Sequence, residues 1–203
     1  MNPELGPASV GEREVVPHGR AGKGSFIGRV ARQAVPIGLG TLVVALAAQF
    51  SVPVPLSPVP MTLQPLAVLA VGGLLGPAGG VSALILYISL GALGLPVFAG
   101  GGAGAIHLIG PTGGYLLAFP VAAGVTGALV SPAPQSVLRV LLACALGMVV
   151  IHVGGVAQLA FLGGDPALAF RVGFLPFLTG DLLKVGLAAA VILAAGPKIR
   201  SLL

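Results

Sequence analysis

The sequence predicts an all-α integral membrane protein with six transmembrane helices, both termini in the cytoplasm and Gly/Pro-rich extracellular lid loops. Of its 203 residues, 56% are hydrophobic and only 7% are charged, and the mean hydropathy is +1.08. A typical soluble domain has about 25% charged residues. The 33 glycines and 18 prolines are therefore expected to shape apolar helices and their connections, because the remaining residues are too apolar for a disordered chain.

Two parts of the chain differ in composition. Residues 1–28 mix charged side chains with Gly, Pro and Ser and lack the apolar core of a signal peptide, so we predict a disordered cytoplasmic tail. Residues 29–203 have the length of a six-helix membrane domain at about 20 residues per span. We place the spans at about 33–50, 62–76, 79–95, 114–131, 137–161 and 174–196.

Basic residues predict the orientation of these spans in the plasma (inner) membrane. The net charge of +5 lies mostly at the chain ends and in short connections, so it indicates the orientation of the chain in the membrane. We expect the lipid bilayer as a partner, and no nucleic acid. With a cytoplasmic N-terminus, only Arg171 falls outside. The residues that fall inside are Arg29, Arg32, Arg139, Lys198 and Arg200.

The same topology leaves three segments outside, at residues 51–61, 96–113 and 162–173, and their composition predicts irregular structure. Irregular backbone at membrane depth is tolerated where protein buries it or water reaches it. We therefore expect the first two segments to fold over a cavity.

Two ionisable side chains, Asp181 and Lys184, lie within the last predicted span. A charge in hydrocarbon is costly unless it is paired or faces a wet cavity, so such a residue is a functional candidate. On a continuous helix, Asp181 and Lys184 share an arc of about 80° with Phe174 and Phe177. This stripe favours a site for a small solute with an apolar body and fixed polar groups. The alternative is a salt bridge that only neutralises both charges and holds two helices together.

The outer segment 96–113 is rich in glycine, which permits close approach of the backbone to a ligand. It also contains apolar side chains such as Phe98 that favour burial. A lid over a pocket satisfies both features, and a merely flexible loop is the alternative. The loop is no phosphate cradle, because no Lys follows its glycines.

Other polar residues are weaker candidates. His107 and His152 are expected to have packing or surface roles, and neither has a companion that would make a metal site. The single cysteine, Cys144, excludes disulfides within the chain. Hydrogen bonds between helices are the expected role of most buried amides and hydroxyls, with Gln64 and Thr62 singled out because they lie at the outer mouth. The amides and hydroxyls considered are Gln49, Gln64, Gln158, Thr62 and Thr112.

No pattern of catalytic residues is present, so we expect neither enzymatic activity nor a cofactor or metal. Nucleotide-binding motifs are also missing. If transport is driven by ATP, another polypeptide must hydrolyse it.

Four segments together resemble the BioY family, the biotin-specific substrate-binding (S) components of energy-coupling-factor (ECF) transporters. The resemblance runs from about Arg32 to the C-terminus. The segments are PVPMTLQ (58–64), GLPVFAGGGAG (94–104), GPTGGYLLAFP (110–120) and LPFLTGDLLK (175–184). The family resemblance implies a six-helix fold that binds biotin near the outer surface, and a complex with a membrane-embedded coupling protein and two ATPase subunits.

The resemblance also implies site residues. The GDLLK match makes Gly180, Asp181 and Lys184 the polar core of a biotin site, with residues 110–115 as part of its wall. A carboxylate and an ammonium suit the two N–H donors and the carbonyl of the biotin ureido ring, and aromatic faces suit its thiophane ring. Lys184 has three possible partners: the ureido carbonyl, the valerate carboxylate or Asp181. The expected site is Asp181, Lys184, Tyr115, Thr112, Gly113, Gly114, Phe98, Gln64, Thr62 and Phe177.

One family feature is altered. S components commonly present an Ala-x-x-x-Ala face on the first helix to the coupling protein, and here that helix offers Ala34 with Gly38 and Thr41 with Ala45. Two alternatives to biotin uptake stay open: an S component for another vitamin, and a non-transporting structural membrane subunit.

Overall fold

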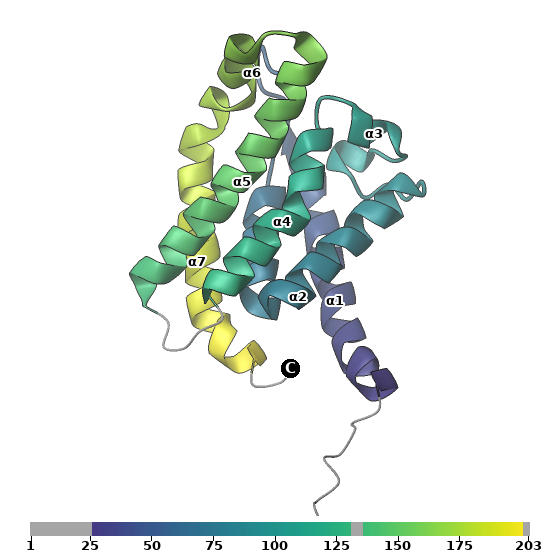
Figure 1. Cartoon of the computed structure of the whole chain (residues 1–203), viewed down its shortest axis with the longest axis vertical. Coiled ribbons are helices and arrows are strands. Elements are labelled where there is room, and N and C mark those ends of the chain that lie inside the picture. The colour runs from purple at the N-terminus through teal and green to yellow at the C-terminus, as the bar shows by residue number, and fades with distance from the viewer. Residues whose placement is uncertain (1–25, 131–135, 201–203) are drawn as a thin grey trace, which may run out of the picture.

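The computed structural model describes residues 26–130 and 136–200. The helices are α1 (Phe26–Gln49), α2 (Gln64–Ala92), α3 (Ile106–Ile109), α4 (Gly113–Val130), α5 (Val137–Gly163), α6 (Pro166–Gly173) and α7 (Leu178–Arg200). Short 3-10 turns occur at η1 (Ala99–Gly101) and η2 (Leu175–Phe177). Figure 1 shows the long helices packed side by side, with α3 and α6 at the upper end and the start of α1 and the end of α7 at the lower end.

The protein is an all-α membrane protein. Within the described residues, four helical stretches are long and apolar enough to cross a bilayer: Gln64–Ala92, Gly113–Val130, Val137–Gly163 and Pro166–Ile199. A shorter apolar helix, Gln33–Gln49, lies in α1. The second and third predicted spans, at about 62–76 and 79–95, both fall largely within the single stretch Gln64–Ala92.

The helix α2 turns back on itself at Gly76, whose backbone is not helical (φ 74°, ψ 179°) and is followed by Pro77. A Cβ atom on Gly80 would lie 2.9 Å from the Cα of Gly72, whereas residues eight positions apart in a straight helix are about 12 Å apart. At the far ends, Gln64 Nε2 donates to the Tyr87 hydroxyl at 2.7 Å. The two halves of α2 are therefore antiparallel neighbours, and the predicted break between residues 76 and 79 corresponds to this turn. No Asp, Glu, Lys or Arg occurs in the sequence between Arg32 and Arg139.

Small residues bring α2, α4 and α5 into backbone contact. A Cβ on Gly72 of α2 would lie 2.7 Å from the Cα of Ala123 in α4. A Cβ on Gly154 of α5 would lie 2.6 Å from the carbonyl oxygen of Gly114 in α4. Helices in lipid associate by such close packing, since the apolar side chains gain nothing by leaving an apolar solvent.

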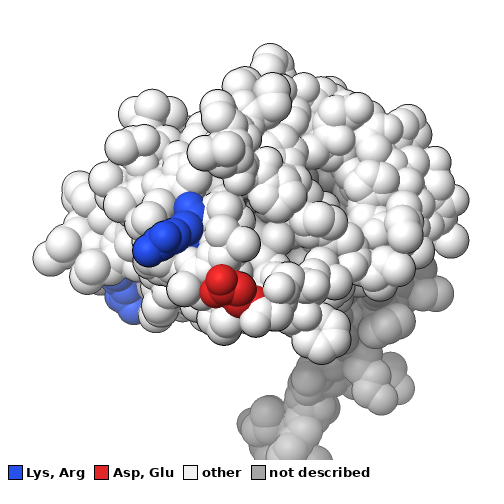
Figure 2. Space-filling view, turned by 90° about the horizontal axis from the view of Figure 1, so that it is seen from above, with Lys and Arg blue, Asp and Glu red and all other residues white. Residues whose placement is uncertain are grey.

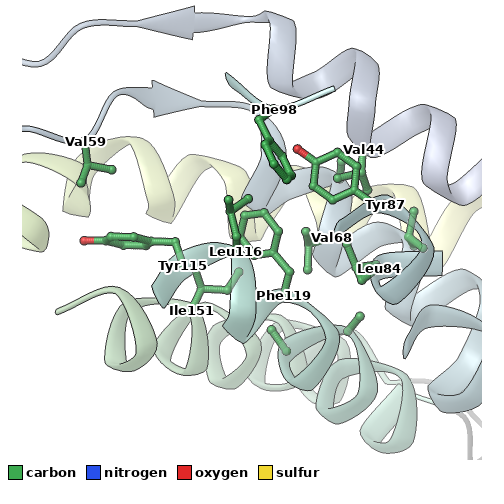
Figure 3. Packing of buried hydrophobic residues seen from close by; sticks show 14 of the residues in the cluster. Val44, Val59, Val68, Leu84, Tyr87, Phe98, Tyr115, Leu116, Phe119 and Ile151 are labelled. Atoms are coloured by element: carbon green, nitrogen blue, oxygen red, sulfur yellow. The ribbon is translucent and has the colours of Figure 1, made fainter. Parts of the chain in front are cut away.

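The surface of the bundle is apolar and its largest side chains are divided between core and lipid. On α5 the exposed positions Leu138, Leu142, Leu146, Val149 and Val153 recur every three or four residues and form one outward stripe. Inside, aromatic and branched side chains from α1, α2, α4 and α5 form a continuous cluster (Figure 3). An apolar face of this kind is stable in hydrocarbon and would be unusual in water.

The outer connections are more ordered than predicted. The 162–173 segment is not irregular, because α5 ends at Gly164 in the left-handed conformation (φ 69°) and α6 starts directly afterwards. The Asp165 carboxylate accepts from the backbone N–H groups of Ala167 and Leu168, and Pro166 occupies the first turn, which is a strong helix start. In the 51–61 segment, strands β1 (Ser51–Val52) and β2 (Met61–Thr62) form an antiparallel pair, with Ser51 opposite Thr62.

The start of the membrane domain also differs slightly from the prediction. The helix α1 begins at Phe26, three residues before the predicted boundary at residue 29. The rest of the predicted tail, residues 1–25, lies outside the described part of the chain.

The backbone conformation at Gly76 leads to a prediction about stability. Its φ and ψ lie in a region open almost only to glycine, so Gly76→Ala is expected to lower the free energy of unfolding by about 1–3 kcal/mol. Gly186→Ala is the matched control, because its Cβ would meet nothing within 4 Å and α7 is helical there. Thermal unfolding in detergent measures both, and equal stability of the two variants would contradict the turn.

Candidate solute-binding site

A cavity of about 250 Å³ lies where the N-terminal ends of α2, α4 and α7 meet the middle of α5. A cavity of this size can hold a small solute. Most of its wall is apolar, and its polar groups come from several elements. The lining residues are Val59, Pro60, Thr62, Gln64, Pro65, Phe98, Ala99, His107, Thr112, Tyr115, Leu116, Phe119, Ile151, His152, Phe177, Asp181 and Lys184.

The strongest polar feature of the cavity is a buried cluster around Asp181. Lys184 Nζ donates to Asp181 Oδ1 at 2.9 Å, and His152 Nε2 lies 2.6 Å from Asp181 Oδ2. All three residues are less than 10% exposed. Asp181 stands in the first turn of α7, where the unpaired N–H groups of the helix favour a negative charge. The ion pair lies within α7, so the His152 contact, and not the salt bridge, joins α5 to α7.

Tyr115 forms the wall beside this cluster. Its hydroxyl donates to the Gly173 carbonyl at 2.6 Å, which ties α4 to the end of α6. The ring fits only because Gly155 lacks a side chain, since a Cβ there would collide with the tyrosine ring. The His152 ring packs edge-on against Tyr115, with centroids 6.2 Å apart, and against Phe174, with centroids 4.9 Å apart.

The mouth is covered by the 96–113 loop, which three side chains hold by its backbone. Gln158 donates to the carbonyls of Leu108 and Gly110, at 3.1 and 2.6 Å. Gln49 donates to the Phe98 carbonyl at 3.4 Å, and the Tyr87 hydroxyl donates to the Val97 carbonyl at 3.0 Å. Figure 3 shows Phe98 pointing from this loop toward Leu116 and Phe119. The amides of Gln49 and Gln158 and the hydroxyl of Tyr87 thus anchor the loop to α1, α5 and α2.

Eight of the ten predicted site residues line this one cavity: Asp181, Lys184, Tyr115, Thr112, Phe98, Gln64, Thr62 and Phe177. Thr62 and Gln64 also bond to each other, since the Thr62 hydroxyl donates to Gln64 Oε1 at 3.0 Å.

Gly113 and Gly114 do not line the cavity. Both are buried under its wall, where a Cβ on either would collide with backbone atoms of Leu108 or Gly154. Their contribution is close packing of α4, because no side chain would fit there.

The predicted stripe on the last span holds only in part. Phe177, Asp181 and Lys184 line the cavity, but Phe174 does not. Phe174 lies between α6 and η2 with φ −124°, so the helical spacing assumed for it does not apply. Its ring instead stacks on the Phe170 ring and packs edge-on against the His152 ring.

Sequence reasoning missed both histidines. His152 was expected to be a packing or surface residue, yet it bonds to Asp181, and His107 lines the cavity from α3. His152 precedes Asp181 by 29 positions on another helix, so no local spacing signals the pair. Among the described residues, no group of three or more His, Cys, Asp or Glu side chains is placed to hold a metal.

The end of the molecule that contains the cavity carries little charge. Figure 2, viewed from this end, shows a nearly uncharged face with small patches of basic and acidic side chains. The polar groups available to a solute at this end are therefore those inside the cavity. The fold and the site together define a multi-pass membrane protein with an internal pocket for a small solute.

Comparisons with known proteins agree with this class. Residues 19–201 match the sequence model of the BioY family. The chain is 40% identical over 162 residues to the biotin transporter BioY of Thermotoga maritima, covering 80% of this chain and 94% of that protein. It is 39% identical over 165 residues to the probable biotin transporter BioY of Pyrococcus horikoshii, covering 81% and 94%. The chain belongs to the BioY family, as its motifs predicted, and is a multi-pass membrane transporter.

A solved structure shares the fold. The crystal structure of the S-component for biotin from an ECF-type ABC transporter superposes with a TM-score of 0.74 at 25% sequence identity. The superposition covers 83% of this chain and 92% of that one. This chain therefore has the S-component fold.

The hydrogen bonds at the mouth predict a stability change. Tyr87→Phe leaves the buried Gln64 amide and the Val97 carbonyl without their partner, so we expect it to lower the free energy of unfolding by about 1–3 kcal/mol. Thermal unfolding measures this change, and a Tyr87→Phe variant as stable as the wild type would contradict it.

Proposed function

We propose that this chain takes up biotin as the substrate-binding S component of an ECF transporter, binding biotin from outside and delivering it inward with an energy-coupling module. The observation that carries the proposal is the buried cluster of Asp181, Lys184 and His152 in an apolar cavity of a BioY family member. Such a chain binds and moves its solute without covalent chemistry.

The cavity offers what a biotin ring system needs. An Asp181 carboxylate oxygen has lone pairs beyond the one that Lys184 or His152 uses, and the Lys184 ammonium has three hydrogens. A ureido N–H suits the first and the ureido carbonyl suits the second. Phe98, Tyr115 and Phe177 offer apolar faces to the thiophane ring. This arrangement favours binding with the ureido ring deep in the cavity.

The alternatives receive less support. A structural subunit would have no use for a cavity of about 250 Å³ beside the buried Asp181–Lys184 ion pair, because an empty volume costs packing energy. An S component for another vitamin keeps the same fold, and binding assays with thiamine and riboflavin distinguish it from a biotin carrier.

For the topology we propose six spans with both termini in the cytoplasm of a plasma-membrane protein. The support is the turn at Gly76, which divides α2 into two antiparallel halves, together with α1, α4, α5 and α7. The start of α5, which carries Arg139, and the end of α7, which carries Lys198, lie at the lower end in Figure 1, whereas α6, which carries Arg171, lies at the upper end. This distribution agrees with the positive-inside rule.

The partners we propose are a membrane-embedded coupling protein and two ATPase subunits. Ala34 and Gly38 are both exposed on α1, and nothing lies within 4 Å of the space a Gly38 Cβ would fill. Thr41, in contrast, is buried and donates to the Ala83 carbonyl at 2.9 Å. Of the two small-residue pairs in the first helix, Ala34 with Gly38 is thus the one accessible to a partner helix.

Biotin binding is tested by calorimetry on the purified chain. We expect saturable binding by the wild type and a loss of affinity of at least about 100-fold in Asp181→Asn and Lys184→Met, because each removes a charged hydrogen-bonding group. Each single variant leaves a buried charge without its partner, so the double variant Asp181→Asn/Lys184→Met is included as a better-folded form without binding.

The matched control is Asp165→Asn. Asp165 is exposed and caps α6, and asparagine caps equally well, so this variant keeps both fold and affinity. A folded wild type that binds no biotin, or binds thiamine or riboflavin in its place, would contradict the proposed function.

The topology is tested by cysteine labelling. The native Cys144 is buried, so the unaltered chain gives the background with a membrane-impermeant maleimide. We expect Arg171→Cys to react in intact cells, and Lys198→Cys to react only after the membrane is permeabilised. Labelling of both positions from the same side would exclude six spans with this orientation.

A further inference from the structure

His152 makes a contact that the proposed biotin site does not by itself explain. It stands on α5, is 7% exposed and places Nε2 at 2.6 Å from Asp181 Oδ2. Lys184 Nζ occupies the other oxygen at 2.9 Å. Each oxygen of the carboxylate is therefore held by a different side chain before any solute enters.

The two ring nitrogens of His152 are in different situations. Nε2 faces a carboxylate that already accepts from Lys184, so Nε2 carries the hydrogen and donates. Nδ1 is buried and has no hydrogen-bond partner among the described residues. A hydrogen on Nδ1 would be an unsatisfied buried donor, so the tautomer with hydrogen on Nε2 alone fits this site.

The ring cannot turn away from Asp181 easily, because aromatic neighbours confine it. Phe174 packs against it edge-on, Phe177 lies with its ring centroid 6.3 Å away, and Tyr115 closes the side toward α4. Tyr115 is in turn fixed by Gly155 and by its bond to Gly173. The direction of the Nε2–H bond is thus set by packing from α4, α5 and the segment before α7.

We propose that His152 is a positioning residue for the solute site. By donating from α5 to Asp181 Oδ2, it fixes the plane of the carboxylate so that the remaining lone pairs point in constant directions toward a ligand N–H donor. Lys184 lies on the same helix as Asp181 and can move with it. Among the described residues, His152 is the side chain that hydrogen-bonds to this carboxylate from another helix. A fixed acceptor binds its ligand more tightly, because no orientation is lost on binding. This inference rests on the proposed function.

Two amide substitutions of nearly equal polarity separate this role from a general need for a polar residue. In His152→Gln the side-chain nitrogen is as many bonds from the main chain as Nε2, so it can still donate to Asp181. In His152→Asn the amide is one bond shorter and reaches only the position of Nδ1. We expect His152→Asn to raise the biotin Kd by about 10- to 100-fold, and His152→Gln by less than about 5-fold.

Calorimetry with biotin reads both variants, with thermal unfolding as the folding control. Equal losses in the two variants, or none in either, would overturn the positioning role while wild-type binding upholds the proposed function. A folded wild type that binds no biotin would instead overturn the proposed function and the positioning role together.

A second measurement does not depend on how well His152→Asn folds. In wild-type protein labelled with ¹⁵N-histidine, we expect a signal from a protonated Nε2 and a bare Nδ1 that is absent from His152→Gln and so belongs to His152. A hydrogen on Nδ1 of that residue would overturn the assigned geometry and the inference with it.

Discussion

Backbone contact between α4 and α5 is the constraint on which the site depends. Gly114 and Gly154 let the two helices approach until main-chain atoms touch, and Gly155 leaves room for the Tyr115 ring one residue further along. This approach brings Tyr115 of α4 and His152 of α5 to the same wall of the cavity. A methyl group at these glycines would separate the helices and move that wall. The glycines of the 110–115 motif thus act through packing, and only their neighbours Thr112 and Tyr115 reach the cavity.

Charge in the bundle is compensated where it is introduced. Asp181 and Lys184 are both buried, and the pair is neutral within one turn of α7, so the helix carries no net charge into the apolar interior. A buried ion pair stabilises a fold little, since desolvation offsets most of the attraction. Its value here is that a neutral polar ligand can share both groups without leaving either charge exposed to hydrocarbon. This explains how a polar site persists in a bundle whose outer surface is almost wholly apolar.

Much of this architecture was predictable from the sequence, and the failures have identifiable causes. The apolar spans followed from hydropathy, and the choice of Asp181 and Lys184 as candidate site residues followed from the cost of charge in lipid. The error at Phe174 arose because helical spacing was extended through Pro176, where the chain forms a 3-10 turn. The helix α6 was missed because composition was weighed above the Asp-Pro start signal at Asp165.

The contact of His152 with Asp181, in contrast, could not be predicted from the sequence. This contact depends on which face of α5 lies against α7, and that is decided by the packing of α5 against helices far from it in the sequence. Tertiary contacts of this kind have no local pattern. The same holds for Gln158, whose bonds to the Leu108 and Gly110 carbonyls cross about 50 positions of sequence. Residue type made Gln158 a candidate for hydrogen bonds between helices, whereas both histidines were expected to have packing or surface roles. Only the fold assigns their partners.

The turn at Gly76 has a consequence for how the chain is made. The hairpin formed by the two halves of α2 has no charged residue, and neither has any part of the chain between Arg32 and Arg139. Lys and Arg residues beside a span set its orientation during insertion, and this interval contains none. The orientation of the hairpin and of α4 is therefore inherited from the basic residues that flank the interval.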